Sequence, residues 1–116
     1  MPVAFVTRDP SKISDGLLLL LRQKLPVIIA QHLSVPEGAL TPEDIELRFM
    51  DIGRFDVVKR PLEILIFAND YPTRRESLEK RSQAITDDVS EMAPGRLTNF
   101  WVWILLGQGG FSKLEK

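Results

Sequence analysis

A proline directly follows the first methionine, and a strand-like run, VAFV, follows the proline. A small second residue normally allows the methionine to be removed, which would leave Pro2 with a free secondary amine. An α-amino group titrates at about 7.7 to 8.0, and an apolar pocket with a nearby arginine destabilises its protonated form. The neutral amine would then be a usable general base. The simpler alternative is that Pro2 only begins a strand, where no ladder hydrogen bond is needed.

The composition limits which other chemistry is available. The chain has no cysteine, which excludes disulfides, thiolate metal sites and a cysteine nucleophile. His32 is the only histidine, and one histidine without an acidic cluster nearby does not build a metal site. The net charge is −1, so no global field attracts nucleic acid or an anionic membrane. We therefore expect no metal, and any anion site must be local.

The 116 residues contain two similar halves, and Pro2 begins the first strand of the first half. Proline-led strands are predicted at PVAFVTRDP and at PLEILIFANDYP, and the similar segments PEGALT and APGRLT each precede a second strand-like run. The chain therefore reads as one domain, 1–116, with repeated halves at about 2–58 and 59–116. Because crossovers between parallel strands are right-handed, we expect two β-α-β units, with a four-stranded sheet and two helices on one face. This is an α+β fold.

The two predicted helices carry different signals. The first should run from about Ser14 to His32, with a kink or a restart at Pro26. The second should begin at a capping box, with Thr73 as N-cap and Glu76 at the third helical position. Their buried stripes are predicted from three-to-four spacing: Leu18, Leu21, Leu25, Ile28 or Ile29, and His32 in the first, and Leu78, Ile85, Val89 and Met92 in the second.

The last predicted strand, NFWVWILL, is apolar on both faces. Side chains alternate along a strand, so Trp101, Trp103 and Leu105 should share the face opposite the helices. An exposed apolar face of this kind argues for an oligomer.

The most apolar stretch, GLLLLLRQKLPVIIA, does not predict a membrane span. Polar residues interrupt it after five leucines, and neither half reaches the roughly 20 apolar residues that a span needs. A signal-peptide pattern is not seen either. We expect a cytoplasmic protein with no membrane partner.

Four segments, taken in order, resemble the tautomerase superfamily: PVAFV, ALTPEDIELRFMDIG, PTRRESLEKRSQAITDDVS and RLTNFWVWILLGQGGF. Its members include 4-oxalocrotonate tautomerase, 5-(carboxymethyl)-2-hydroxymuconate isomerase, macrophage migration inhibitory factor (MIF) and cis-3-chloroacrylic acid dehalogenase. The resemblance implies a MIF-like fold of doubled β-α-β units that forms a homotrimer. It also implies a tautomerase or isomerase in which Pro2 is the catalytic base, acting without metal or organic cofactor on a small enol or α-keto carboxylate.

The same resemblance implies further site residues. Arg74 and Arg75 occupy the place of a substrate-binding arginine, and an arginine fork at a helix start suits a carboxylate. The alternative is that both are simply solvated. His32 resembles a histidine of the chloroacrylate dehalogenases, although it also suits a packed position at a helix end. Arg48 resembles a strand arginine of the small tautomerases.

Two aromatic residues complete the expected binding site. Trp103 stands where the dehalogenases carry a water-activating tyrosine, and no carboxylate follows near the strand's end, which argues against dehalogenase or hydratase activity. Phe111 lies in GQGGF, which resembles a terminal hairpin beside a neighbouring subunit's site and would supply an apolar wall.

Two other functions suit the same pattern. A retained methionine would make the Pro2 nitrogen an amide, and the chain would then be a non-catalytic binding or interaction protein with the same fold. A nucleic-acid module would also show this element order with strand aromatics such as Phe5, Phe49 and Trp101. The net charge and the absence of a GFGFVxF-type strand motif argue against nucleic acid as a partner.

Overall fold

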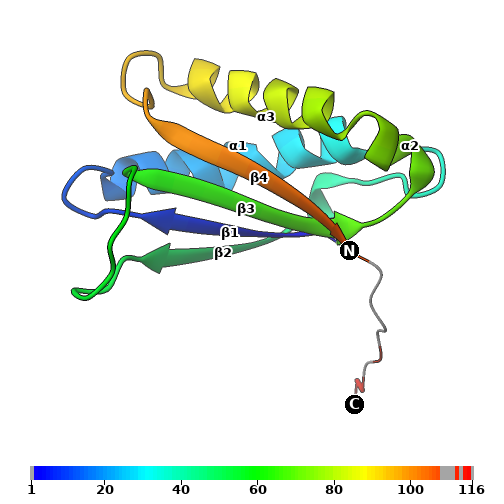
Figure 1. Ribbon diagram of the computed structural model, residues 1–116, viewed down its shortest axis with the longest axis horizontal. Coiled ribbons are helices and arrows are strands. Elements are labelled where there is room, and N and C mark those ends of the chain that lie inside the picture. Colours follow the sequence, from blue (N-terminus) through cyan, green and yellow to red (C-terminus); the bar gives the residue numbers. More distant parts are fainter. Residues whose placement is uncertain (1, 108–111, 113, 116) are drawn as a thin grey trace.

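The computed structural model describes residues 2–107, 112, 114 and 115. The elements follow one another as β1 (Val3–Arg8), α1 (Asp15–Leu33), the 3₁₀ helix η1 (Pro42–Asp44), β2 (Glu46–Asp51), β3 (Leu62–Asn69), α2 (Pro72–Glu76), α3 (Leu78–Met92) and β4 (Phe100–Gly107). Helices α1 and α3 lie side by side on one face of the sheet (Figure 1).

The sheet has four strands in the order β2-β1-β3-β4. Strand β1 pairs in parallel with β2, and β3 pairs in parallel with β4, while the two central strands, β1 and β3, are antiparallel. Each parallel pair is joined through a helix that crosses the same face. The predicted doubling of a β-α-β unit is therefore confirmed.

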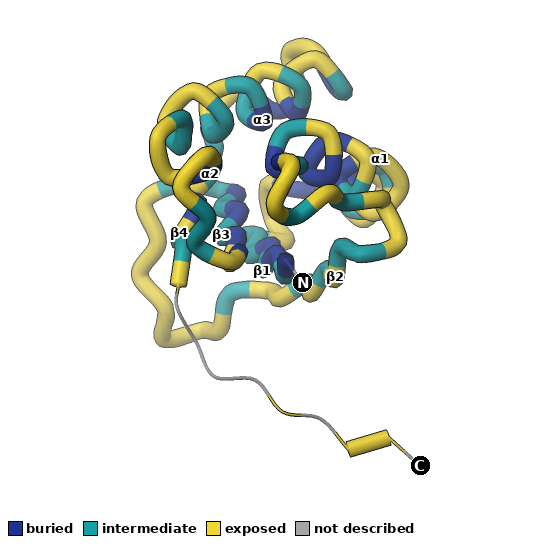
Figure 2. Tube along the Cα trace, turned by 90° about the vertical axis from the view of Figure 1, so that its right-hand side faces the viewer, coloured by how far each residue is buried: buried dark blue, intermediate teal, exposed yellow. Residues whose placement is uncertain are grey.

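The core lies between the helices and the sheet, as the buried segments in Figure 2 show. Alternate strand residues point into it because side chains alternate along a strand. Its members include Ala4 and Val6 of β1, Leu62, Ile64 and Ile66 of β3, Leu21, Leu25 and Ile29 of α1, and Ile85 and Val89 of α3. Of the stripe predicted for the second helix, Ile85 and Val89 are buried, whereas Leu78 and Met92 are half-buried.

Helix α1 continues through Pro26, so of the predicted kink or restart the structure excludes the restart. A proline inside a helix costs about 3 kcal/mol, because one backbone hydrogen bond is lost and the ring crowds the preceding turn. Leu25 and Ile28 on either side of it are buried in the core, and their burial offsets that cost. The helix begins as expected, with the Ser14 hydroxyl accepting a hydrogen bond from the Leu17 amide at 3.2 Å.

The predicted capping box at the second helix is also wrong. Helix α2 begins two residues earlier than predicted, at Pro72 with Tyr71 as N-cap, and the fixed φ of proline suits the first helical position. Thr73 therefore lies inside the helix, and its hydroxyl donates to Glu37 at 2.9 Å instead. Ser77, at φ −120° and ψ 23°, then separates α2 from α3.

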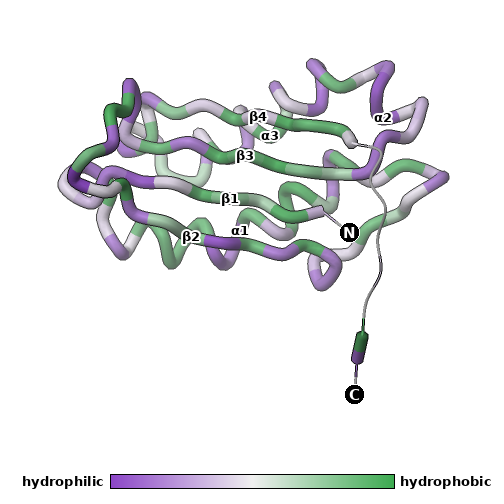
Figure 3. Tube along the Cα trace, turned by 60° about the horizontal axis from the view of Figure 1, so that its bottom comes forward, coloured by the Kyte–Doolittle hydropathy of each residue, from purple (hydrophilic) through white to green (hydrophobic). Residues whose placement is uncertain are grey.

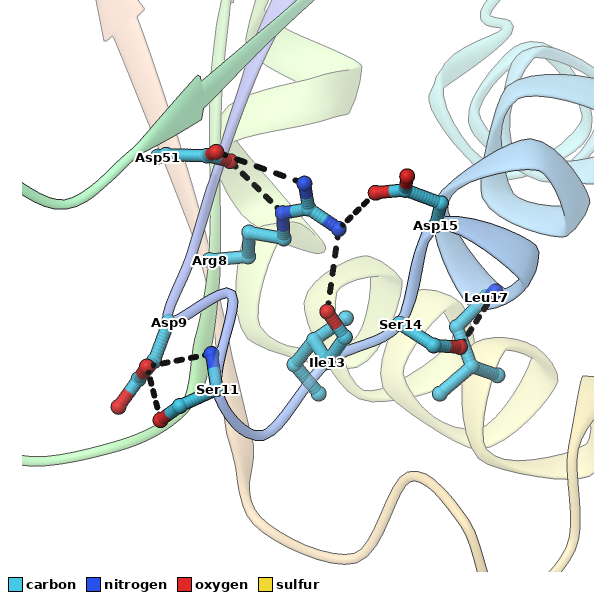
Figure 4. Close-up of polar contacts among 8 residues, drawn as sticks. All are labelled: Arg8, Asp9, Ser11, Ile13, Ser14, Asp15, Leu17 and Asp51. Carbon is cyan, nitrogen blue, oxygen red and sulfur yellow. Dashed lines mark hydrogen bonds and ion pairs between the residues drawn. The ribbon is translucent and has the colours of Figure 1, made fainter.

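Arg8, the last residue of β1, links this strand to β2 and to the start of α1 (Figure 4). Its Nε donates to Asp51 at 2.7 Å, and its Nη1 lies 2.6 Å from Asp15 and donates to the Ile13 carbonyl at 3.1 Å. The hydrogen bonds that Arg8 donates to Asp51 and Asp15 raise its pKa, so it stays charged. The ends of β1 and β2 and the start of α1 are thereby joined.

The second face of the sheet, here called the open face, is uncovered in the single chain (Figure 3). Trp101, Trp103 and Leu105 are 47%, 43% and 45% exposed there, as predicted from their alternation. Phe5 and Phe67 lie on the same face and pack edge to face, with ring centroids 5.8 Å apart. Among the described residues, no helix is both long and apolar enough to span a bilayer.

Candidate active site

Pro2 lines a cavity of about 260 Å³. The cavity lies where the start of β1 meets the end of the antiparallel β3, so residues from both halves of the chain reach it. Its wall is formed by Pro2, Gly38, Ala39, Leu40, Asp44, Asn69, Tyr71 and Arg74. Three segments of the sequence therefore build it: the chain start, the connection from α1 to β2, and the connection from β3 to α2.

Pro2 is held in this wall by strand pairing. Its side chain is less than 2% exposed, and its carbonyl accepts a hydrogen bond from the Glu46 amide at 3.1 Å, which extends the β1–β2 ladder. A proline nitrogen contributes no ladder hydrogen bond. The position of the nitrogen is thus set by the strand, while the nitrogen itself is left out of the sheet.

Arg74 is the buried cation of the cavity wall, with only 2% of its surface exposed. Its Nε and Nη2 donate to the Leu33 carbonyl at 3.0 and 2.7 Å, and its Nη1 donates to the Asn69 carbonyl at 2.9 Å. Nη2 also makes a longer contact of 3.5 Å to the Gly38 carbonyl. Burial lowers the pKa of Arg74, and the nearby Tyr71 partly opposes this effect.

These contacts leave little of the guanidinium for a ligand. An arginine carries five N–H donors, and the contacts above use one on Nε, one on Nη1 and both on Nη2. One Nη1 donor remains. Arg74 therefore acts first as a structural residue, which ties the end of α1 to the end of β3.

Tyr71 is a wall residue that the sequence analysis did not single out, although it is the only tyrosine of the chain. Its ring has two close neighbours. The Arg74 Cζ is 5.1 Å from the ring centroid, and Gly38 is so close that a Cβ atom there would lie 2.6 Å from Tyr71 Cε2. The ring is thus fixed by packing. Its position between the end of a strand and a helix-starting proline was the available signal.

Asp44 also lines the cavity and was not predicted. Its Oδ2 accepts hydrogen bonds from the Thr41 amide at 2.8 Å and from the Thr41 hydroxyl at 3.2 Å. This arrangement closes η1 and places a carboxylate in the wall that Pro2 shares. A second carboxylate, Glu37, precedes the wall residue Gly38 in the chain. Hydrogen bonds from its own backbone and from the Thr73 hydroxyl lower the pKa of Glu37.

His32 lies away from this wall, in a contact between the two long helices. Its Nε2 is 2.6 Å from Asp88 Oδ2, which joins α1 to α3. The adjacent Arg81 donates from Nη1 to the His32 carbonyl at 2.7 Å and to the Ser34 carbonyl at 3.3 Å. Within one chain, the structure does not bring His32 to the cavity of Pro2.

The remaining predicted site residues are also placed elsewhere in the single chain. Arg75 is exposed and bonds Asp70 at 2.9 Å, so Arg74 is the member of the pair that faces the cavity. Arg48 and Trp103 lie on exposed sides of β2 and β4, where they bond Glu46 at 3.0 Å and Glu63 at 3.0 Å. Phe111 and the predicted hairpin beyond Gly107 fall outside the described residues.

No protein-family model matches the sequence, and the search of curated proteins finds no match. Solved structures do match the fold. A macrophage migration inhibitory factor-like protein from Entamoeba histolytica has 13% identity and a TM-score of 0.62, with 96% of this chain and 95% of that chain covered.

Two other similar structures are a fused 4-OT described as a symmetric trimer and a member of the cis-3-chloroacrylic acid dehalogenase family named N1. The first has 13% identity and a TM-score of 0.58, and it covers 90% of this chain and 84% of that chain. The second has 12% identity and a TM-score of 0.59, with 97% and 82% covered. The expected tautomerase or MIF-like fold is thereby confirmed, and at this identity the likeness concerns the fold.

Proposed function

We propose that this chain, which has the fold of the tautomerase superfamily, is a cofactor-independent tautomerase or isomerase. Its catalytic base would be the amine of Pro2 after removal of the methionine, and its substrate a small enol or α-keto carboxylate. The observation that carries the proposal is that Pro2 lines a 260 Å³ cavity together with the buried cation of Arg74.

The surroundings of Pro2 favour a neutral amine. Burial disfavours the charged form of an amine, and a positive charge in the same wall disfavours it further. The Asp44 carboxylate in the same wall opposes this effect, so the base would be the neutral fraction of the Pro2 amine. It could take a proton from the carbon next to a carbonyl, or from an enol hydroxyl, and return it elsewhere on the conjugated system.

The cavity wall gives a carboxylate a single strong donor rather than a fork. The remaining Nη1 donor of Arg74 would make one charge-assisted hydrogen bond, while Asp44 in the same wall repels a second negative charge. A substrate with one carboxylate therefore suits the cavity of a single chain better than a dicarboxylate.

We also propose that the protein is a homotrimer, with the open face as its contact surface. The exposed Trp101, Trp103 and Leu105 would be covered there, and one protein of similar fold is described as a symmetric trimer. Arg48 and Trp103 would then lie at subunit contacts, and His32 and Arg75 would keep the contacts with Asp88 and Asp70 that they make within each chain.

A second candidate is a binding protein of the same fold that has no catalytic base. The engagement of Arg74 by backbone carbonyls favours it, because this arginine has a structural role that does not require a substrate. In this case the methionine would be retained and the Pro2 nitrogen would be part of a peptide bond.

The test combines intact mass with turnover. Mass spectrometry first establishes whether the methionine is removed. Phenylenolpyruvate, with one carboxylate, and 2-hydroxymuconate, with two, are then assayed with the wild type, with Pro2→Ala, and with a variant carrying a lysine inserted before Pro2. The inserted residue turns the Pro2 nitrogen into an amide, so the rate should fall about 100- to 10,000-fold. Equal rates for the wild type and the inserted variant would refute the proposal.

A further inference from the structure

A base alone does not complete a keto-enol exchange, because the carbonyl oxygen gains a proton as the neighbouring carbon loses one. Four residues with polar side chains share the cavity wall with Pro2: Asp44, Asn69, Tyr71 and Arg74. The question is which of them can deliver that proton.

Three of the four are poorly suited to the task. The guanidinium of Arg74 is held by backbone carbonyls and keeps its protons at any ordinary pH. The carboxylate of Asp44 accepts two hydrogen bonds from Thr41 and is an acceptor only when ionised. The side-chain amide of Asn69 can donate a hydrogen bond, but it is not a proton-transfer group.

Tyr71 has a suitable group and a fixed position. Its hydroxyl has no hydrogen-bond partner among the described residues, so a ligand in the cavity would not have to displace one. Its half-buried ring packs closely against Gly38 and lies beside the Arg74 guanidinium. A donor that is held in place before the ligand arrives loses little conformational freedom on binding.

We propose that Tyr71 is the catalytic acid that works opposite Pro2, a step that rests on the proposed function. The Pro2 nitrogen takes the proton from the carbon next to the carbonyl, and the C–H electron pair forms the new C=C bond. The carbonyl π pair moves to oxygen, which takes the phenol proton of Tyr71. The product is the enol, with a protonated Pro2 amine and a Tyr71 phenolate, and a proton passed from the amine to the phenolate restores both groups.

The neighbouring charge suits this step. The Arg74 Cζ lies 5.1 Å from the Tyr71 ring centroid, so a permanent cation stands beside the group that becomes negative. The cation is buried, and a charge acts more strongly away from bulk water. The same contact explains why an arginine that is largely engaged by carbonyls would still matter for turnover.

The first test is Tyr71→Phe, which removes the hydroxyl and keeps the ring beside Gly38 and Arg74. We expect kcat on phenylenolpyruvate to fall about 100-fold, with KM and the melting temperature little changed. Ser90→Ala, which removes an exposed hydroxyl on α3, is the matched control and should retain full activity.

The second test uses the fact that Tyr71 is the only tyrosine. Incorporation of 3,5-difluorotyrosine changes this one phenol to a more acidic one and leaves every other side chain unchanged. The alkaline limb of the kcat/KM profile should then move to lower pH. A purely structural role of the ring would leave that limb where it is.

The outcomes separate the two proposals. A large loss on blocking the Pro2 amine, with full activity in Tyr71→Phe and an unmoved alkaline limb, would overturn the role of Tyr71 and leave the proposed function standing. Full activity with the Pro2 amine blocked, or no turnover of either substrate by the processed wild type, would overturn both.

Discussion

Gly38 lies so close to Tyr71 that a Cβ atom on residue 38 would be 2.6 Å from the ring carbon Cε2. This contact is shorter than real Cβ atoms make, and the backbone of the turn from Val35 to Gly38 is itself held by hydrogen bonds in both directions. The glycine is therefore required by the close approach of the ring.

The substitution Gly38→Ala should displace the Tyr71 ring and change the cavity wall. We expect kcat/KM to fall about tenfold or more, since small displacements of positioned groups carry large rate effects. Gly16→Ala is the control, because its Cβ would meet nothing nearer than 3.7 Å. That change lies in α1 and should stabilise the protein by up to about 1 kcal/mol. Unchanged kinetics in Gly38→Ala would show that the ring position is unimportant.

Arg74 and Arg75 are adjacent, and they should respond differently to replacement by alanine. Arg74→Ala leaves the carbonyls of Leu33 and Asn69 without their donor, so the free energy of unfolding should fall by about 3 kcal/mol. Arg75→Ala removes only an exposed pair with Asp70 and should change it by less than about 0.5 kcal/mol. Urea denaturation measures both, and equal effects would contradict the structural role of Arg74.

Assembly should depend on the open face and not on the outer face of α1. Leu105→Glu places a charge among the exposed aromatic side chains of β4 and should convert the proposed trimer to monomers. Leu19→Glu changes a leucine that is 62% exposed on α1 and should leave assembly intact. Sedimentation velocity at micromolar concentration distinguishes these results. A Leu105→Glu trimer, or a monomeric wild type, would exclude this face as the contact.

Asp9 should contribute to the loss of stability in acid. Hydrogen bonds from the Ser11 hydroxyl and amide lower the pKa of Asp9 in the folded protein (Figure 4). A lowered folded pKa gives stability that is fully present above the unfolded value, about 3.9, and is lost as the pH falls through the folded value. Asp9→Asn should remove this part of the pH dependence, and Ser11→Ala should remove some of it, because the amide donor remains. The free energy of unfolding should be measured between about pH 2 and pH 5 for the wild type and both variants. The same change with pH in all three proteins would contradict this prediction.

The fold was predictable because its signals are periodic. Alternation in β4 predicted the two faces of that strand, and the repeated strand-helix-strand order predicted the two parallel pairs, whereas the antiparallel pairing of β1 with β3 was not predicted. Local chemistry was less predictable, since a capping box at Thr73 and a helix start at Pro72 are both consistent with the sequence PTRRE. In the structure the helix begins at Pro72, and the Thr73 hydroxyl donates its hydrogen bond to a residue distant in sequence, Glu37.

The candidate site was predictable only where one residue carries the chemistry. Pro2 could be recognised from its position alone, whereas the engagement of Arg74 depends on carbonyls at Leu33 and Asn69 that no local pattern reveals. Tyr71 was missed for a related reason. Its importance comes from the close approach of Gly38, 33 positions earlier in the chain, and from the cavity wall that it shares with Pro2, and both appear only after folding.

Two arginines of the second repeat contact the end of α1, and these contacts affect how the chain folds. The last carbonyls of that helix, which belongs to the first repeat, receive their hydrogen bonds from Arg74 and Arg81 of the second repeat. The central pairing of β1 with β3 likewise joins one repeat to the other. Neither repeat can therefore satisfy its own backbone, and the two should melt in a single cooperative transition. Expressed as separate fragments, each half should remain unstructured until the other is supplied.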